Sequence, residues 1–168
     1  IEKSALVHLR KTSENVLDRD IGLMIAVIGI DEIGQGRLIP GDGATYHSVV
    51  YKVLVFKPIR GEVVEGSVVE IMDFGAFVRV GPLDGLCHVS QICDDFITQD
   101  QKGNALLGKE TGRVLSEGDY VRARITSISF ESGNRSGKLG LTMRQPFLGK
   151  IGREHPWVEE DLKKARGE

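Results

Sequence analysis

From Glu62 onward, short runs of β-forming residues alternate with turn residues, and this pattern restricts the possible folds more than any other feature of the chain. A polar insertion at residues 93–118 interrupts the pattern. Five runs are expected to form strands, three before the insertion and two after it, at residues 62–72, 75–80, 85–89, 119–131 and 138–144. Five short strands in this order predict a small Greek-key barrel of the OB type.

The segment before the barrel mixes helical and extended patterns. Apolar residues recur at every fourth position over residues 1–9, which predicts a short amphipathic helix. An apolar run at 21–30 predicts a buried strand, and a second long strand is expected at 46–57. The charged, glycine-containing stretch 31–37 predicts the flexible tip of a hairpin between them. Residues 1–58 are therefore expected to form a small α+β domain.

The C-terminal part contains a helix signal. Pro156 precedes a charged stretch with an acidic first turn and a basic end, which predicts a helix at 157–165. Within the insertion, residues 105–107 and 114–115 predict a small hairpin. We therefore expect a mostly β, α+β chain in three parts: an α+β domain, a five-stranded OB barrel and a helical tail, at 1–58, 59–146 and 147–168.

Charge and cysteine content limit the function classes. The net charge of −2 excludes a polycation that binds nucleic acid by bulk charge. Residues 59–100 carry two basic and eight acidic side chains, whereas 101–144 carry eight basic and four acidic ones, so a nucleic-acid surface must be local and involve the second segment. Two cysteines are too few for a disulfide scaffold, which favours a reduced, intracellular compartment. No apolar run approaches the ~20 residues that span a bilayer, so membrane insertion is disfavoured.

Two aromatic residues and a histidine lie in and beside the second and third expected strands. Because successive strand residues point to opposite faces, Phe77 and Arg79 are expected to lie on the face away from the apolar row. Gly75 permits a sharp turn that brings Phe74 near Phe77, and His88 lies on the next strand. Two rings and an imidazole on one barrel face suit stacking on single-stranded bases. The alternative is that both rings belong to the core; we predict that they protrude towards solvent.

Three sequence blocks around these residues resemble a known module. They have the patterns G-x-V-x-x-I-x-x-F-G-A-F-V, D-G-L-x-H-x-S and G-D-x-V-x-x-R-I, in this order over residues 66–125. This arrangement is similar to the RNA-binding OB domain first named from the largest small-subunit ribosomal protein, the S-one domain. The resemblance implies that Phe74, Phe77 and His88 contact RNA.

Basic side chains near these strands are candidates for further RNA contacts. Alternation places Arg122 and Arg124 on one face, away from the apolar row of their strand. Lys138 takes the position of a basic residue that S-one domains carry beside the final turn, whereas Ser129 stands near the place of their acidic residue. A solvated charged face is the alternative. We expect the RNA-binding set to include Arg79, Arg122, Arg124 and Lys138.

Three further stretches narrow the resemblance, at residues 40–47, 91–96 and 141–146. Together with the small domain before the barrel, they make the chain similar to the archaeal RNA polymerase stalk subunits called E prime, counterparts of the seventh subunit of eukaryotic polymerase II. The resemblance covers essentially the whole chain, with a first strand expected before Ile1. In that family the N-terminal "tip" domain anchors in the polymerase body, and the barrel lies beside the RNA exit path.

The resemblance implies an accessory subunit of a multisubunit DNA-dependent RNA polymerase, acting in the archaeal cytoplasm on nascent single-stranded RNA. Its implied partners are the polymerase core subunits and a second stalk subunit, called F, that spans both domains. The alternative is a free-standing translation or RNA-processing factor with the same barrel, although an initiation factor more often carries the barrel first. By analogy, polymerase contact is implied for Ile33, Gly34, Gln35, Gly36, Arg37, Leu38, Ile39 and Pro40.

No catalytic residue, metal or cofactor is predicted. Cys87 and His88 are adjacent, but alternation points them apart, so a thiol nucleophile with its base is not expected. Cys87 and Cys93 lack the ligand-pair spacing of a zinc site, and the glycine pairs lack the Lys-Ser/Thr of a phosphate loop. Asp94 and Asp95 are expected to be solvated rather than to bind a metal. An enzyme therefore ranks below both binding functions.

Overall fold

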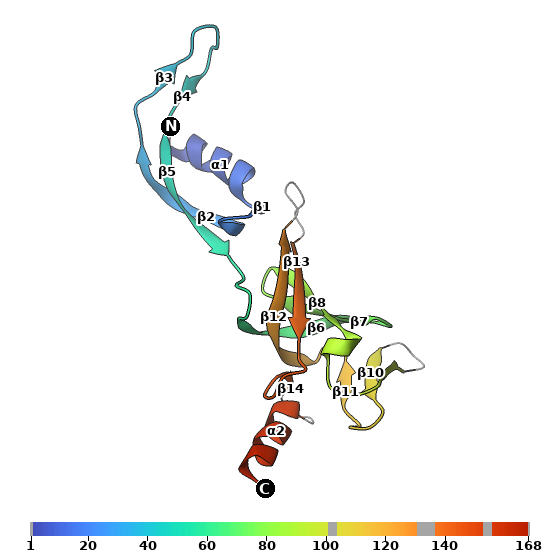
Figure 1. Ribbon diagram of the computed structural model, residues 1–168. Coiled ribbons are helices and arrows are strands. Elements are labelled where there is room, and N and C mark those ends of the chain that lie inside the picture. The colour runs from blue at the N-terminus through green and yellow to red at the C-terminus, as the bar shows by residue number, and fades with distance from the viewer. Residues whose placement is uncertain (1, 101–103, 131–136, 153–155, 168) are drawn as a thin grey trace. The chain divides into compact units, whose positions relative to one another are not determined.

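The computed structural model describes four ranges of the chain, residues 2–100, 104–130, 137–152 and 156–167. Figure 1 shows their helices and strands in chain order, from blue to red. The described residues form two compact units, the first ending at Lys57 and the second beginning at Pro58. The fold is mostly β with a helix near each end, as predicted. Ile1 and Glu131, which belong to expected elements, lie outside the described residues. Neither described helix has the length and apolar character that crossing a bilayer requires.

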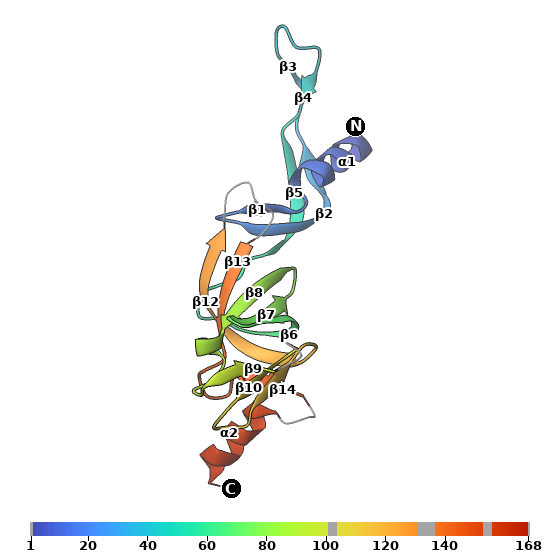
Figure 2. The same ribbon diagram turned by 90° about the vertical axis from the view of Figure 1, so that its right-hand side faces the viewer.

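The N-terminal unit is built on a long hairpin. β1, β2 and β5 form an antiparallel sheet in the order β1-β2-β5, and β3 pairs with β4 as a separate ribbon. The helix α1 packs against β2 (Figure 2). The bounds of these elements are α1 Glu2–Ser13, β1 Val16–Asp18, β2 Gly22–Ile33, β3 Arg37–Leu38, β4 Thr45–Tyr46 and β5 Val49–Phe56.

Polar contacts tie the end of α1 to the sheet. The carboxylate of Glu14 accepts a hydrogen bond of 2.9 Å from the backbone N–H of Val27, where a bulge shifts the register of β2 against β5. The hydroxyls of Ser13 and Tyr51 lie 3.2 Å apart. Leu23 and Val27 are the buried apolar residues of β2. Because these contacts join the end of α1 to both β2 and β5, the helix has a defined position on the sheet.

The outer part of the hairpin differs from the prediction. Residues 31–33 end β2 and residues 37–38 form β3, so the chain reverses between β3 and β4, not at 31–37. The strand expected to be buried is only partly so, since Ile21 and Ile28 are 46% and 64% exposed. A 12-residue helix such as α1 rises about 18 Å, whereas a 12-residue strand such as β2 rises about 40 Å. One helix therefore cannot cover the whole length of this hairpin.

The second unit contains the predicted five-stranded barrel. The strands pair in the order β13-β8-β7-β6-β12, and an additional pairing of β12 with β13 closes the circle. β8 and β13 are parallel, and the other neighbours are antiparallel. Each strand lies within about two residues of its expected bounds. The strands are β6 Val63–Met72, β7 Gly75–Val80, β8 Leu83–His88, β12 Tyr120–Phe130 and β13 Gly137–Thr142.

The barrel interior is filled by alternate residues of its strands. The inward row of β7 is Ala76, Val78 and Val80, as predicted, and each of these residues is buried. Between them, Phe77 is half-buried and Arg79 is exposed. This alternation fixes which side chains of β7 are available at the barrel surface.

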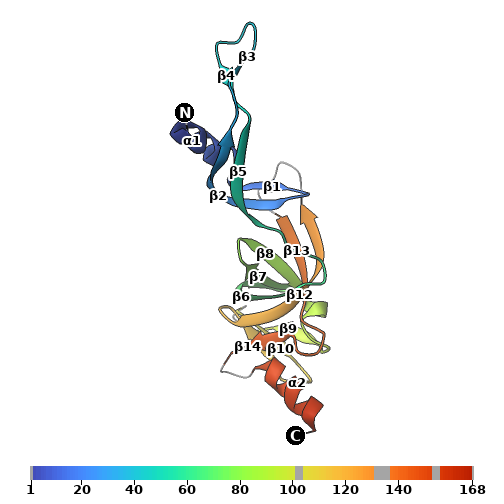
Figure 3. The ribbon, with the colours of Figure 1, turned by 90° about the vertical axis from the view of Figure 1, so that its left-hand side faces the viewer.

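The insertion and the tail add elements to the second unit. The predicted hairpin of the insertion forms, and a third strand, which the sequence did not predict, pairs with it. The tail is not only helical, because β14 pairs with β12 before α2 begins (Figure 3). The bounds are η1 Val89–Gln91, β9 Ile97–Gln99, β10 Ala105–Gly108, β11 Val114–Ser116, β14 Gly149–Ile151 and α2 Trp157–Arg166.

One arginine joins α2 to the insertion. The guanidinium of Arg113 lies 5.1 Å from the ring centroid of buried Trp157 and 3.1 Å from the carboxylate of Asp161. The same carboxylate accepts a hydrogen bond of 3.1 Å from the backbone N–H of Phe147. The first turn of α2 is therefore held by packing, a cation–π contact and an ion pair.

Candidate nucleic-acid interface

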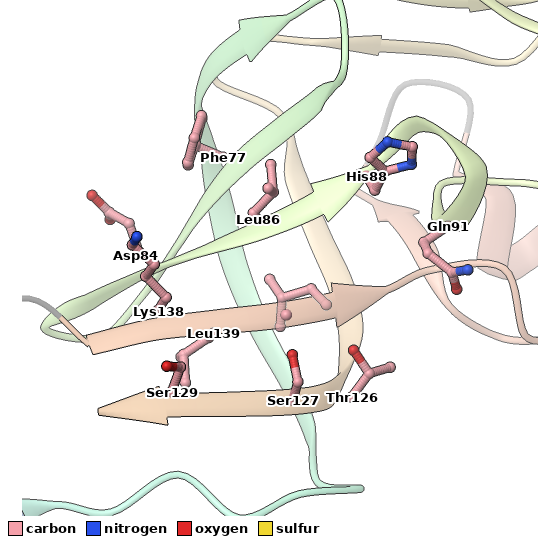
Figure 4. Close-up of a pocket in the computed structure, with 12 residues that line it drawn as sticks. Phe77, Asp84, Leu86, His88, Gln91, Thr126, Ser127, Ser129, Lys138 and Leu139 are labelled. Atoms are coloured by element: carbon pink, nitrogen blue, oxygen red, sulfur yellow. The ribbon is translucent and has the colours of Figure 1, made fainter. Parts of the chain in front are cut away.

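The outward faces of β7 and β8 carry the predicted aromatic and histidine side chains. Phe77 is the register partner of Leu86, and Gly75 is the partner of His88. Cys87 is fully buried, and both of its neighbours on β8 point outward, as predicted. Figure 4 shows that Phe77, Leu86 and His88 come from adjacent strands on one side of a groove.

The groove has a volume of about 540 Å³. Its aromatic and apolar side comes from β7 and β8, and a side rich in hydroxyl groups comes from β12 (Figure 4). β13 pairs with both β8 and β12 and so lies between the two sides. The groove is lined by Phe77, Asp84, Leu86, His88, Gln91, Thr126, Ser127, Ser129, Lys138, Leu139, Gly140 and Leu141.

The two phenyl rings form an edge-to-face pair. The centroids of Phe74 and Phe77 are 6.2 Å apart, and the ring planes meet at 89°. Phe74 is 44% exposed and Phe77 is half-buried, so neither ring fills the core, as predicted. A Cβ on Gly75 would collide with the carbonyl oxygen of Cys87 and would lie 3.0 Å from the Cα of His88. The absence of a side chain at Gly75 therefore lets β7 and β8 approach closely beside the aromatic pair.

The ring nitrogens of His88 have distinct roles. The backbone N–H of Ser90 donates to Nδ1 at 3.3 Å, and the Ser90 hydroxyl lies 2.9 Å from the same atom. Because a backbone N–H can only donate, Nδ1 is the unprotonated nitrogen of the neutral ring, and Nε2 carries the proton. The neutral imidazole therefore offers an Nε2–H donor to a ligand.

Charges around the groove are almost balanced. Arg79 donates to Asp84 through two atoms, from Nε at 2.9 Å and from Nη2 at 3.3 Å. This hydrogen-bonded carboxylate raises the pKa of Arg79 above its ordinary value. Lys138 lines the groove near Asp84 and makes no ion pair with the described part of the chain (Figure 4). Asp84 is therefore paired with Arg79, and Lys138 is the charged residue of the groove lining without an ion-pair partner among the described residues, apart from any charge on His88.

Three hydroxyl groups on β12 were not selected by sequence reasoning. Those of Thr126, Ser127 and Ser129 line the groove and form no hydrogen bond with the residues that the structure describes. Thr126 and Ser127 both reach it because a β-bulge follows Ile125. The alternation of apolar and polar residues does not reveal where a bulge occurs. The run of Thr and Ser residues was the one feature of the sequence that could have indicated these hydroxyl groups. Asp84 and Gln91, which also line the groove, were likewise not selected.

The structure does not bring Arg122 and Arg124 into the groove. Arg122 forms an ion pair of 2.8 Å with Glu65 on β6. Arg124 donates to Oε1 of Gln145 at 2.7 Å and to the carbonyl of Gly61 at 2.8 Å. Both arginines alternate with the buried Val121, Ala123 and Ile125, as predicted. The outer surface of a closed barrel curves, however, so side chains on one outward face of β12 need not lie beside the same neighbours. Contact of the two arginines with RNA stays a prediction.

The start of the segment implied to contact polymerase forms hydrogen bonds with the residues that connect β4 to β5. The backbone N–H of Gly34 donates to the carbonyl of Ser48 at 2.7 Å, and Nδ1 of His47 lies 3.0 Å from the carbonyl of Gly34. Beyond this point Leu38 and Ile39 are exposed, and Leu38 reaches 74%. The segment therefore presents apolar side chains on a hairpin with a defined base.

Other candidate chemistries find no support in the described residues. Burial raises the pKa of the Cys87 thiol to about 12, so it is not a thiolate nucleophile at neutral pH. Within the described ranges, no three His, Cys, Asp or Glu side chains are grouped to hold a metal ion. Asp95 accepts hydrogen bonds from the backbone N–H and the hydroxyl of Thr111, at 2.9 and 2.7 Å, which gives it a structural role in the insertion.

Comparisons with known proteins match both units. Residues 1–43 match the family described as "SHS2 domain found in N terminus of Rpb7p/Rpc25p/MJ0397". Residues 57–134 match the family described as "S1 RNA binding domain". The second match covers β6 to β8 and β12, which supply most of the groove, and it agrees with the resemblance to the S-one domain.

Several relatives that match most or nearly all of the chain are RNA polymerase subunits. The "DNA-directed RNA polymerase subunit Rpo7" of Saccharolobus shibatae is 39% identical over 163 residues, which are 97% of this chain and 88% of that protein. The Rpo7 of Sulfolobus acidocaldarius is 39% identical over 165 residues, 98% and 87% of the two chains. The "DNA-directed RNA polymerase II subunit rpb7" of Dictyostelium discoideum is 28% identical over 132 residues, 78% and 76%. The chain therefore belongs to the Rpo7 family of non-catalytic archaeal RNA polymerase stalk subunits, the counterparts of Rpb7, with an SHS2 domain followed by an S1 domain.

Proposed function

We propose that this stalk subunit binds nascent single-stranded RNA in the groove of its S1 barrel. The observation that carries the proposal is the meeting, in one groove, of the half-buried ring of Phe77, the ammonium group of Lys138 and hydroxyls that form no hydrogen bond with the described residues. Every base has a π face, so stacking on an aromatic ring is tolerant of sequence and contributes about 1–3 kcal/mol per base. The hydroxyls and Lys138 supply partners for sugar and phosphate oxygens.

The groove favours single strands over duplexes. Stacking on Phe77 requires a base whose face is open, and bases in a duplex are already stacked on one another. The Nε2–H of His88 adds a donor for a base edge or a phosphate. With one uncompensated lysine in the lining, few phosphates are neutralised, so we expect modest affinity with a shallow dependence on salt.

The N-terminal unit supplies the anchor in this proposal. The hairpin segment 33–40 presents exposed Leu38 and Ile39, which suits insertion into an apolar cleft of the polymerase core. Ile28 and Val50 on the β2–β5 hairpin are also more than half exposed, and we assign this further apolar surface to partners in the complex, including the second stalk subunit. The chain itself contributes binding and positioning in the cytoplasm, whereas nucleotide addition belongs to the core.

The test is an RNA titration of the 168-residue chain followed by fluorescence anisotropy. Phe77→Ala removes the stacking ring, so binding of a labelled single-stranded RNA is expected to weaken by about 1–3 kcal/mol, or about 5- to 150-fold. Phe96→Ala is the matched control, because this phenyl group belongs to the same unit, is 75% exposed and does not line the groove.

The control is expected to bind like the unchanged chain. If Phe77→Ala and the unchanged chain bind the RNA with equal affinity, the groove is not the RNA-binding site. Equal weakening by Phe77→Ala and Phe96→Ala would show that any exposed ring supports binding, which also contradicts the proposal.

A further inference from the structure

We propose that Asp84 holds Arg79 away from bound RNA and so limits the number of phosphates that the groove neutralises. The inference rests on the proposed RNA binding and adds to it a residue that sets its strength. Arg79 on β7 and Asp84 on β8 are register partners, so the backbone itself places the two side chains together. Both the Nε and the Nη2 of Arg79 are engaged by the two carboxylate oxygens, at 2.9 and 3.3 Å.

Only one member of the Arg79–Asp84 pair lines the groove. Asp84 lines the groove and lies near Lys138, whereas Arg79 is not among the lining residues (Figure 4). The Arg79 side chain is 59% exposed, so burial does not keep it from a ligand. The ion pair with Asp84 is therefore the interaction that directs this guanidinium.

The competition between two anions explains the proposed effect. A phosphate that approaches Arg79 must replace a carboxylate already bound in the two-point geometry that guanidinium groups favour. Exchange of one anionic partner for another adds little to binding, and the displaced Asp84 would face the RNA as a second negative charge. Asn at position 84 would remove both effects and leave phosphate as the preferred partner of Arg79.

The number of neutralised phosphates is measured by the salt dependence of binding. For single strands, the slope of log K against log salt concentration changes by about −0.7 for each phosphate neutralised. In the anisotropy assay, Asp84→Asn is expected to make the slope more negative by about 0.7 and to tighten binding at low salt by about two- to fivefold, as for one exposed ion pair.

The matched control is Asp31→Asn. It changes the net charge by the same amount and releases Lys52, which pairs with Asp31 in the N-terminal unit and outside the groove. We expect this variant to keep the slope of the unchanged chain. The double variant Arg79→Gln, Asp84→Asn tests the route of the effect, because the steeper slope must disappear when the guanidinium is removed.

Three results would overturn the inference: weaker RNA binding by Asp84→Asn, an unchanged slope, or an equal change with Asp31→Asn. If the unchanged chain binds RNA through Phe77 but Asp84→Asn has no effect, the proposed function stands and the inference fails. If the unchanged chain binds no RNA, both fail. The pair is exposed, so the variant is expected to fold. If thermal unfolding shows that Asp84→Asn does not fold, Asp84→Ser removes the same charge and takes the place of Asp84→Asn in the assay.

Discussion

Two glycines of the barrel are expected to respond differently to the same added methyl group. In Gly75→Ala, the new Cβ would collide with the carbonyl oxygen of Cys87 and lie 3.0 Å from the Cα of His88. These are backbone atoms of the neighbouring strand, and no side-chain rotation relieves the collision. β7 and β8 would have to separate beside the aromatic pair.

In Gly140→Ala, the atoms nearest to the new methyl group belong to side chains instead of backbone. Its Cβ would approach the hydroxyl of Ser127 and lie 3.1 Å from the hydroxyl of Thr126. Both oxygens are ends of side chains that line the groove, so they are able to rotate. The methyl group would then occupy the surface between the two sides of the groove with little change in the barrel.

The magnitudes follow from these contacts. Overpacking costs about 1–3 kcal/mol, and we place Gly75→Ala at or above the upper end because the backbone has to move. At about 4–8 °C per kcal/mol for a domain of this size, the midpoint of thermal unfolding should fall by about 12–24 °C. Gly140→Ala should cost less than about 1 kcal/mol of stability. It should weaken RNA binding by about 1 kcal/mol, the lower limit for one lost stacking contact.

The assays are thermal unfolding followed by far-ultraviolet circular dichroism and the RNA titration by anisotropy. If Gly75→Ala lowers the midpoint no more than Gly140→Ala does, the close approach of β7 and β8 is not a constraint on the fold. If Gly140→Ala binds RNA with unchanged affinity, the surface between the two sides of the groove takes no part in binding.

Two further predictions concern the anchor and the insertion. Leu38→Asp should weaken binding of the chain to the polymerase core by about 1.5–3 kcal/mol, because one apolar side chain is no longer buried in the complex. The control Val7→Asp changes an exposed residue of α1 and should leave binding unchanged. Equal binding of the two variants would contradict the anchoring role of the hairpin. Hydrogen bonds from Thr111 lower the pKa of Asp95 from 3.8 to about 2, so the carboxylate stabilises the fold fully above about pH 4 and loses this effect as the pH falls towards 2. The difference in urea midpoint between the unchanged chain and Asp95→Asn should therefore shrink over that pH range, and a constant difference would refute the assigned contacts.

Much of the barrel was predictable because its signals are local. Each strand alternates apolar and polar residues between turn signals, and the inward row that contains Val78 follows directly from that alternation. The pairing of β14 with β12 was not predictable, since three residues give no periodicity. In the N-terminal unit, the apolar run at 21–30 predicted a buried strand. Burial depends on which elements pack on that strand, and no element in the described part of the chain buries Ile28.

The candidate site was predictable to the same extent. The outward positions of Phe77 and His88 followed from alternation within short strands, and the proximity of Phe74 to Phe77 followed from the turn at Gly75. Alternation placed Arg122 outside the barrel but could not show that it pairs with Glu65 away from the groove, because alternation says nothing about position around a closed barrel. The ion pair of Arg79 depends on strand register, which becomes visible only when β7 and β8 are paired.

The parallel pairing of β8 with β13 has a consequence for the order in which the molecule is made. β8 ends at His88 and its partner begins only at Gly137, so about fifty residues must leave the ribosome before that pair can form. The hairpin of β2 and β5, by contrast, joins segments close in sequence and is complete once Lys57 has been added. Non-local pairing slows folding, and N-terminal units generally fold first during synthesis. The unit proposed to dock on the polymerase can therefore fold before the groove proposed to bind RNA can form. A truncated chain that ends before residue 137 is expected to keep the first function and to lack the second.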